Sequence, residues 1–251
     1  MSSRSDPASP RRRFFVPPAA LDGDTIVFAM REAHHIARVL RLRPGTRIVV
    51  FDGRREVDAE LLAVGDAGVT AAKTGAPRAA VRPFSLVLLQ GVPRGPKMDV
   101  IVRMATEIGV SAVHPVLTER SVIDPSPARV ERWRRIAREA AKQCGRADVP
   151  EISLPVVLGD ALAAIGPVDL LIVPWEETAR PLGEVAAGRP FASAAFLIGP
   201  EGGLTAVEVG TVRAAGGEAI SLGPLLLRTE TAGLVTAAML LYERLLRHPG
   251  S

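Results

Sequence analysis

Residues 194–208, AAFLIGPEGGLTAVE, decide the class of fold that this sequence adopts. The apolar run from Ala194 to Ile198 is typical of a strand that is buried on both faces. It leads directly into a Gly-Pro-Glu-Gly-Gly turn, after which Thr205 and Glu208 form the T-x-x-E capping box that begins a helix. A buried strand, a tight turn and a helix in this order are the repeating unit of a parallel α/β sheet.

The same alternation continues over the region from residue 83 to residue 248. Helical periodicity predicts helices over 96–108, 126–143 and 230–247. Continuous apolar segments predict strands at 85–92, 111–117, 169–175, 194–200 and 218–223. We therefore expect a parallel sheet with helices on both of its faces.

The region before it has a different pattern. Short segments separated by Asp-Gly, Pro-Gly and Gly-Asp turns predict a small β-rich domain over 14–76, with strands at 25–29, 46–52, 56–64 and 68–73. A helix is expected from about Arg31 to Arg41, with Ile36, Val39 and Leu40 on its buried side. Residues 1–13 have the composition of a disordered basic tail, and 76–83 that of a linker.

Composition excludes several classes of protein. No run of eighteen apolar residues occurs, so no membrane span is expected. A single cysteine, Cys144, excludes an internal disulfide and fits a reducing cytoplasm, and the four histidines lack the spacing of metal ligands, so no metal site is expected. The formal charge is +5 over residues 1–82 (14 Lys/Arg, 9 Asp/Glu) and −1 over the rest (17 and 18). This bias indicates a first domain that binds a polyanion. The alternative is an arginine-rich composition in which the arginines only occupy solvent-exposed positions.

Three loops follow apolar strands on the carboxyl side, where open α/β sheets bind ligands: 174–177, 199–203 and 222–230. The glycines of the second loop allow a ligand to approach the backbone, although a tight turn without a ligand would use the same residues. It matches neither the phosphate-binding loop nor the G-x-G-x-x-G dinucleotide motif. In the third loop, Leu225 to Leu227 either pack in a core or form the wall of a pocket for a flat apolar group.

Two of these segments carry a resemblance to a known family. LIGPEGGLTAVE (197–208) and LGPLLLRTETA (222–232) are similar to the signature of the RsmE family of 16S ribosomal RNA (uracil-N3) methyltransferases, which belongs to the SPOUT class. RRRFFV (11–16), HHIARVLRLRPG (34–45), KMDVIVRMATEIGVSAVHPVLTERS (97–121) and ERWRRIAREAAKQCGRADVP (131–150) extend the likeness over most of the chain. The resemblance implies a SPOUT domain with a deep trefoil knot over 83–248 and a PUA-like β-barrel that binds RNA over 14–76.

The resemblance also implies the reaction: transfer of a methyl group from S-adenosyl-L-methionine to N3 of a specific uridine in small-subunit ribosomal RNA. The base must be unpaired or flipped out, because N3 lies on its pairing edge. Loss of the N3 proton spreads negative charge over O2 and O4, which Arg228 would stabilise while Glu201 or Glu230 accepts the proton. These two acids remain alternatives, since each can also cap a helix or pair with Arg228.

The remaining site residues follow from the same resemblance. The cofactor would be held by Val173, Pro174, Ile198, Gly199, Pro200, Gly202, Gly203, Leu222, Gly223, Leu226 and Leu227. RNA would be bound by Arg11, Arg12, Arg13, Arg38, Arg41, Arg43, Arg120 and Arg146. Two positions depart from the family pattern. Leu225 stands where many members have Arg, so Arg228 is expected to carry more of the contact with the RNA. Cys144 stands where many members have Ser. Cys144 is expected to be a small buried residue at a helix end.

The final helix is apolar around much of its circumference, so it is buried within one chain or lies in a dimer interface. SPOUT relatives are usually homodimers, which favours the second interpretation. The expected partners are 16S ribosomal RNA or the small ribosomal subunit, and the expected location is the cytoplasm. Two other functions remain open: another SPOUT RNA methylation, such as ribose 2′-O methylation, and a non-catalytic ribosome assembly factor.

Overall fold

The computed structural model describes residues 12–65, 67–81, 84–122, 125–186 and 191–247, and the chain falls into two compact units. The first comprises Met1–Val81 together with Ala141–Val149, and the second comprises Arg82–Ala140 together with Pro150–Ser251. No helix within these described ranges is both long and apolar enough to cross a membrane.

Residues 141–149 were expected in the second domain, but they cluster with the first unit. Lys142 donates to Glu32 at 2.9 Å, and both side chains are largely buried. Asp148 forms a parallel bridge with Gly53. These two contacts join the segment to the first unit across a long stretch of sequence, which a prediction based on local pattern cannot detect.

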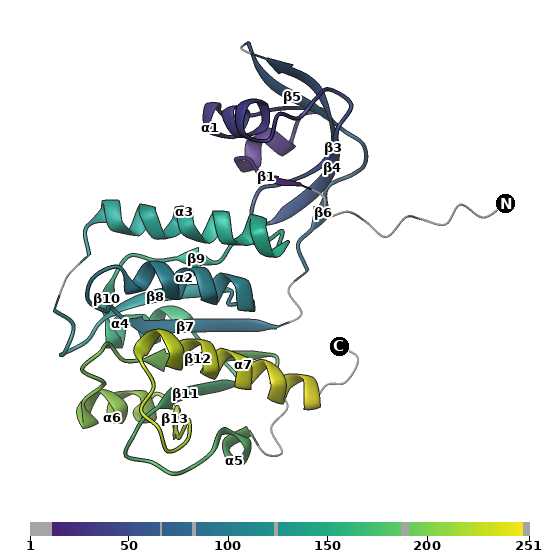
Figure 1. Cartoon of the computed structure of the whole chain (residues 1–251). Coiled ribbons are helices and arrows are strands. Elements are labelled where there is room, and N and C mark those ends of the chain that lie inside the picture. The colour runs from purple at the N-terminus through teal and green to yellow at the C-terminus, as the bar shows by residue number, and fades with distance from the viewer. Residues whose placement is uncertain (1–11, 66, 82–83, 123–124, 187–190, 248–251) are drawn as a thin grey trace. The chain divides into compact units, whose positions relative to one another are not determined.

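The first unit contains a six-stranded sheet with the order β1-β3-β4-β5-β2, and β6 pairs with β4 (Figure 1). β1 runs parallel to β3, and the other pairs are antiparallel. Its strands are β1 (Arg13–Phe15), β2 (Thr25–Val27), β3 (Arg47–Phe51), β4 (Arg55–Gly65), β5 (Gly68–Lys73) and β6 (Arg78–Ala79), and a short 3-10 helix, η1, spans Pro18–Leu21. A single core, which includes Phe14, Ile26, Ile36, Val50 and Leu61, lies against the sheet.

Two local predictions for this unit were wrong, and a third, the helix over 31–41, is confirmed only in part. Arg13, placed in the tail, begins β1, and the expected linker contains β6; the tail residues 1–11 lie outside the described residues. The expected helix over 31–41 is α1 (Met30–His34) followed by a π-helix, η2 (His35–Val39). Its backbone N–H of Leu40 donates to the carbonyl of His35, five residues earlier. Wider turns rotate Val39 away from the side of Ile36, so Val39 is 62% exposed while Ile36 is buried.

The second unit contains a seven-stranded sheet with the order β10-β8-β7-β12-β11-β13, and β9 pairs with β8. Every pairing in it is parallel. Its strands are β7 (Ser85–Gly91), β8 (Ala112–Leu117), β9 (Glu151–Ile152), β10 (Val156–Val157), β11 (Leu170–Pro174), β12 (Ser193–Ile198) and β13 (Glu218–Ile220). Its helices are α2 (Lys97–Ile108), α3 (Pro127–Cys144, whose last residues cluster with the first unit), α4 (Leu158–Ile165), α5 (Leu182–Ala186), α6 (Ala206–Ala214) and α7 (Thr229–Arg247).

Helices cover both faces of this sheet, which confirms the predicted α/β architecture. Alternate residues of a strand point to opposite faces. On one face, Leu89 and Leu197 pack with residues of α4 and α6. On the other face, Leu88 and Phe196 lie against α2 and α7. The helices predicted over 96–108, 126–143 and 230–247 correspond to α2, α3 and α7, whereas α4 and α5 were not predicted.

The carboxyl end of β7 packs closely against the turn that follows β12. A Cβ atom on Gly91 would lie 2.7 Å from Cδ of Pro200 and 2.9 Å from its nitrogen. Backbone from two neighbouring strand ends therefore meets at a position that only glycine can occupy.

We expect Gly91→Ala to lower the free energy of unfolding by about 1–3 kcal/mol, because the added methyl group overlaps Pro200 in a packed region. Gly210→Ala in α6 is the matched control: a Cβ there meets nothing within 4 Å, and alanine should stabilise the helix by about 0.5–1 kcal/mol. Urea denaturation of both variants measures the difference. Equal stability of the two would contradict the close approach at Gly91.

Candidate functional site

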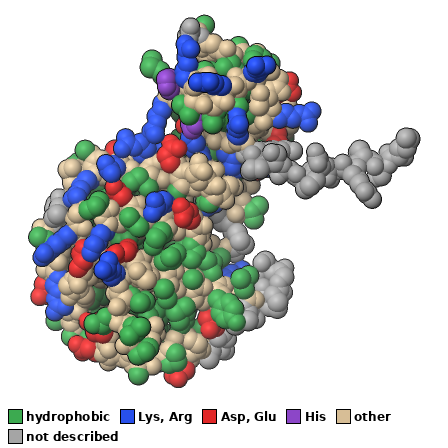
Figure 2. Space-filling view, in the orientation of Figure 1, with side chains coloured by type: hydrophobic (Ala, Val, Ile, Leu, Met, Phe, Trp, Pro, Cys, Tyr) green, Lys and Arg blue, Asp and Glu red, His purple; other side chains and the backbone are tan. Residues whose placement is uncertain are grey.

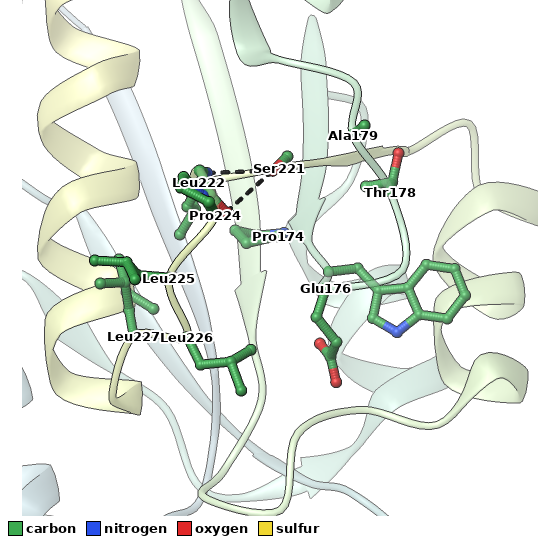
Figure 3. Close-up of a pocket in the computed structure, with 13 residues that line it drawn as sticks. Pro174, Glu176, Thr178, Ala179, Ser221, Leu222, Pro224, Leu225, Leu226 and Leu227 are labelled. Atoms are coloured by element: carbon green, nitrogen blue, oxygen red, sulfur yellow. Dashed lines mark hydrogen bonds between the residues drawn. The ribbon is translucent and has the colours of Figure 1, made fainter.

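A pocket of about 500 Å³ lies at the carboxyl ends of the adjacent strands β11 and β13. Two loops form it, one following each strand. Figure 3 shows Leu222 and Leu225–Leu227 on one side of this space and Glu176, Thr178 and Ala179 on the other. The position agrees with the general rule that open parallel sheets bind ligands beyond their carboxyl edge. We call this space the apolar pocket.

The wall formed by the leucines is unusual for a protein surface. Leu225, Leu226 and Leu227 are 77%, 86% and 36% exposed, although large apolar side chains normally avoid water. Of the two alternatives for this loop, packing in a core or forming the wall of a pocket, the structure shows the second. None of the described residues that line the pocket is Lys or Arg, and Glu176 contributes the one carboxylate among them.

The loop 199–203 is held in shape by its own glycines. A Cβ on Gly199 would lie 2.9 Å from the backbone carbon of Gly203, and Gly203 has a φ of +72°. Glycine is favoured at both positions because the loop folds tightly on itself. The predicted capping box is confirmed: Glu208 donates its N–H to Thr205, and the Glu208 carboxylate accepts the N–H of Thr205.

A buried hydrogen-bond chain ties this loop to the start of α7. The hydroxyl of Thr229 donates to the carbonyl of Gly199 at 2.7 Å. The same hydroxyl accepts from the side-chain amide of Gln90 at 3.0 Å, and that amide also donates to the carbonyl of Gly91. The ends of β7 and β12 and the beginning of α7, far apart in the sequence, are thus fixed to one another.

A second space, of about 790 Å³, lies beyond the ends of β7, β8 and β12; we call it the second hollow. Its lining includes Arg94, Lys97, Arg120 and Glu201. Lys97 pairs with Glu201 at 2.8 Å, and the backbone N–H of Arg94 donates to the same carboxylate. Burial alone would raise the pKa of Glu201, but hydrogen bonds from Lys97, from its own N–H and from that of Arg94 outweigh it and hold the pKa below its usual value.

Five of the predicted cofactor residues line the apolar pocket: Pro174, Leu222, Gly223, Leu226 and Leu227. Val173, Ile198, Gly199, Pro200, Gly202 and Gly203 do not, although Gly202 lines the second hollow. The lining also includes residues that were not predicted: Trp175, Glu176, Thr178, Ala179, Ser221, Pro224, Leu225 and Ala232. Trp175 and Glu176 belong to a loop that the sequence had singled out, so their position after β11 was the available signal.

The three predicted catalytic residues lie in different surroundings. Arg228 is exposed at the start of α7, directly after the leucine wall. Glu201 is paired with Lys97 beside the second hollow. Glu230 faces an apolar cleft between α2 and α7, where its Oε2 is buried without a hydrogen-bond partner in the described part of the chain.

The predicted RNA-binding arginines separate into exposed and largely buried groups. Arg12, Arg38, Arg41 and Arg43 are exposed on the first unit, and Arg120 is exposed beside the second hollow, whereas Arg11 lies outside the described residues. Arg13 and Arg146 are each only 14% exposed, in ion pairs with Glu56 and Asp148 at 2.6 Å. Cys144, expected to be buried, is exposed at the end of α3.

Comparison with known proteins assigns the family. A model described as RNA methyltransferase domain matches residues 81–241, and one described as RNA methyltransferase PUA domain matches residues 31–71. The chain is 31% identical to the Synechocystis sp. "Ribosomal RNA small subunit methyltransferase E", covering 91% of this chain and 76% of that protein. It belongs to this methyltransferase E family.

Two further relatives agree. The Bacillus subtilis "Ribosomal RNA small subunit methyltransferase E" is 33% identical, covering 88% of this chain and 91% of that protein. A crystal structure of the protein of the same name from Neisseria gonorrhoeae, "bound to S-adenosyl methionine", superposes with a TM-score of 0.84 at 29% identity, covering 92% of this chain and 97% of that one.

We expect Thr229→Val to lower the free energy of unfolding by about 1–3 kcal/mol, because it removes, at nearly constant volume, the buried hydroxyl that donates to the half-buried carbonyl of Gly199. Thr229→Ser keeps the hydroxyl and should remain close to the wild type. Thr211→Val, whose hydroxyl is exposed on α6, is the control for loss of a surface threonine. If Thr229→Val unfolded at the same urea concentration as Thr211→Val, the buried chain would not stabilise the site.

Proposed function

We propose that this protein transfers a methyl group from S-adenosyl-L-methionine to N3 of a uridine in 16S ribosomal RNA. The observation that carries the proposal is the apolar pocket, whose wall of exposed leucines has no structural purpose unless a ligand covers it. The family of the chain and the printed names of its relatives support the reaction and the RNA substrate.

The chemistry of the pocket suits this cofactor. Adenine is flat and apolar on its faces, so it gains by covering Leu222, Leu226 and Leu227. The sulfonium and ammonium groups of the cofactor are cations, and the carboxylate of Glu176 lies on the opposite wall. A pocket without Lys or Arg among its described lining is unsuited to cofactors that carry several phosphates. The bound cofactor supplies the activated methyl group, and this chain supplies position and electrostatics.

The residues then have separate roles. Arg228, at the end of the leucine wall, stabilises the negative charge that develops on O2 and O4 of uracil as N3 loses its proton. Of the two carboxylates, Glu201 is the weaker proton acceptor, because its pKa is lowered and it is paired with Lys97. Glu230 has a carboxylate oxygen, Oε2, without a partner in the described structure, but it lies in the cleft between α2 and α7 and lines neither of the two spaces, so both acids stay open as the proton acceptor. The loop 199–203 fixes the distance between cofactor and base.

The first unit is proposed to hold RNA in a PUA-like barrel through its exposed arginines Arg12, Arg38, Arg41 and Arg43. Arg13 and Arg146 are left out of this proposal, because their guanidinium groups are largely buried in ion pairs. Arg120 is kept as an RNA contact on the second unit. Because the proposed substrate is ribosomal, the proposal includes action in the cytoplasm.

Two features of assembly complete the proposal. The trefoil knot of the second unit is proposed from the family resemblance. Figure 2 shows hydrophobic side chains gathered on the face of the second unit where α7 lies, and Leu234, Tyr242 and Leu245 of that helix are 36%, 61% and 65% exposed. A second copy of the chain that covers this face would form a homodimer.

The direct test uses small ribosomal subunits and 16S RNA from cells that lack this protein. Incubation with the pure protein and methyl-labelled cofactor should yield labelled 3-methyluridine at one position, identified by mass spectrometry of nucleosides. A label on the ribose would show a 2′-O methyltransferase instead, and cofactor binding without transfer to either substrate would favour an assembly factor.

We expect Leu226→Asp to weaken cofactor binding at least about 10-fold, because burial of a leucine side chain contributes about 1.5–3 kcal/mol and the aspartate disrupts the apolar wall. Its melting temperature should change little, since Leu226 is 86% exposed. Val207→Asp in α6, which replaces another exposed apolar residue outside the pocket, is the control. Calorimetric titration with S-adenosyl-L-methionine measures the affinity, and unchanged binding by Leu226→Asp would place the cofactor elsewhere.

We expect Arg228→Ala to reduce the methylation rate about 100- to 1,000-fold while cofactor affinity changes little, since its charge acts mainly in the transition state. Arg228→Lys should restore part of the rate, because a point charge lacks the planar fork of a guanidinium. Single-turnover rates at saturating cofactor, measured beside melting curves, test this. A lower melting temperature with an intact rate per folded molecule would instead make Arg228 a structural residue at the start of α7.

A further inference from the structure

The second hollow is separate from the apolar pocket, yet the two approach each other at a single residue. A Cβ on Gly203 would lie 3.4 Å from Oε1 of Glu176, which lines the apolar pocket, and 3.7 Å from Nη1 of Arg120, which lines the second hollow. Glu176 of the apolar pocket and Arg120 of the second hollow thus both lie next to Gly203. We call the loop segment Gly202–Gly203 between the two spaces the glycine wall.

The wall itself is built tightly. The aliphatic part of Arg120 packs on Gly202, where a Cβ would lie 3.2 Å from its Cβ and Cδ atoms. The guanidinium of Arg120 donates to the carbonyl of Gly202. Any side chain at position 202 or 203 would thicken the wall, so the glycines keep the two spaces within reach of each other.

The lining of the second hollow holds three cations, from Arg94, Lys97 and Arg120, against two carboxylates, from Glu119 and Glu201, so its positive charge is only partly neutralised. Glu201 pairs with Lys97, but in the described part of the chain no carboxylate forms an ion pair with the guanidinium of Arg94 or of Arg120. Both side chains are exposed. Two guanidinium groups beside an open space of this size suit a phosphodiester, which each can bind through two parallel hydrogen bonds.

Glu201 holds this arrangement in place. Its carboxylate accepts from the ammonium of Lys97 at 2.8 Å and from the backbone N–H of Arg94 at 3.2 Å, so it connects the loop after β12 to the loop after β7. It therefore fixes Arg94 relative to the glycine wall, as a positioning residue.

We propose that the second hollow receives the flipped target nucleotide of the RNA, with the adjoining phosphodiester bound by Arg94 and Arg120 and the base directed toward the wall at Gly203. This rests on the proposed function and names the place of its second substrate. Direct methyl transfer needs the acceptor nitrogen within about 3–3.5 Å of the methyl group before reaction. Backbone atoms between the two groups would hold them farther apart than this, so the base must pass the solvent-exposed edge of the wall beside Gly203, where Glu176 and Arg120 approach each other.

The first test blocks the space. Val122 lines the second hollow and is 60% exposed, so Val122→Trp fills it without removing a polar group. We expect methylation of small subunits or 16S RNA to fall at least about 50-fold, while the melting temperature and the affinity for S-adenosyl-L-methionine stay within the range of the control Val122→Ala. Equal methylation by the two variants, with both folded and binding cofactor, would overturn the proposal.

The second test concerns the phosphodiester. Arg94→Gln should raise the RNA concentration that gives half-maximal methylation about 10-fold, and should reduce the slope of log affinity against log salt by about 0.7 for the lost phosphate contact. Arg94→Lys should recover part of the loss. Arg103→Gln on α2 removes the same charge from an exposed position outside the second hollow and should match the wild type. If Arg94→Gln behaved as Arg103→Gln does, no phosphate would be bound there.

The proposed uridine-N3 reaction and the proposed position of the nucleotide in the second hollow can each be wrong without the other. Methylation of a ribose or of another base by the wild-type protein would contradict the proposed uridine-N3 reaction, and Val122→Trp would still report whether the accepting nucleotide enters the second hollow. If the wild type and Val122→Trp formed 3-methyluridine at equal rates, the proposed reaction would stand. The proposed position of the nucleotide in the second hollow would then be wrong.

Discussion

The hydroxyl of Thr229 is the contact on which the rest of the site depends. It joins the carbonyl of Gly199 to the side chain of Gln90, and thereby fixes the start of α7 against the ends of two central strands. The leucine wall directly precedes Thr229, and the glycine turn begins at its acceptor. This contact thereby links the two loops that flank the proposed reaction to each other.

The two spaces at the carboxyl edge of the sheet differ in the chemistry of their lining residues. Beyond β11 and β13 the edge is apolar and holds one carboxylate among its described lining. Beyond β7, β8 and β12 the edge presents two arginines and a lysine with two glutamates, which leaves a net positive charge. An apolar, cation-accepting space suits the methyl donor, and a basic space suits an RNA nucleotide. The glycines of the turn between them have two purposes, because they permit the tight fold of the loop and keep the wall thin.

The sequence predicted the features that depend on local pattern. Apolar strands, the capping box at Thr205 and the three long helices were all found where the periodicity placed them. The glycines of 199–203 were expected to touch the cofactor, and this stays a prediction; in the structure they shape the loop, with other parts of the loop, Glu176 and Arg120 as their neighbours. The pairing of Lys97 with Glu201 and the attachment of residues 141–149 to the first unit could not be predicted, since both join segments that are distant in sequence. The π-helix at His35 was missed because its wider turn leaves no mark on a periodicity of 3.6.

The central claim is that methyl donor and target nucleotide occupy two spaces on either side of Gly203. A crystal structure of the protein with S-adenosylhomocysteine and a short RNA containing the target uridine tests it most directly. The account predicts adenine against Leu222, Leu226 and Leu227, and a uridine beyond Gly203 with its phosphodiester at Arg94 and Arg120. Adenine outside the leucine wall, or a uridine that reaches the sulfur from any side other than the second hollow, would contradict it.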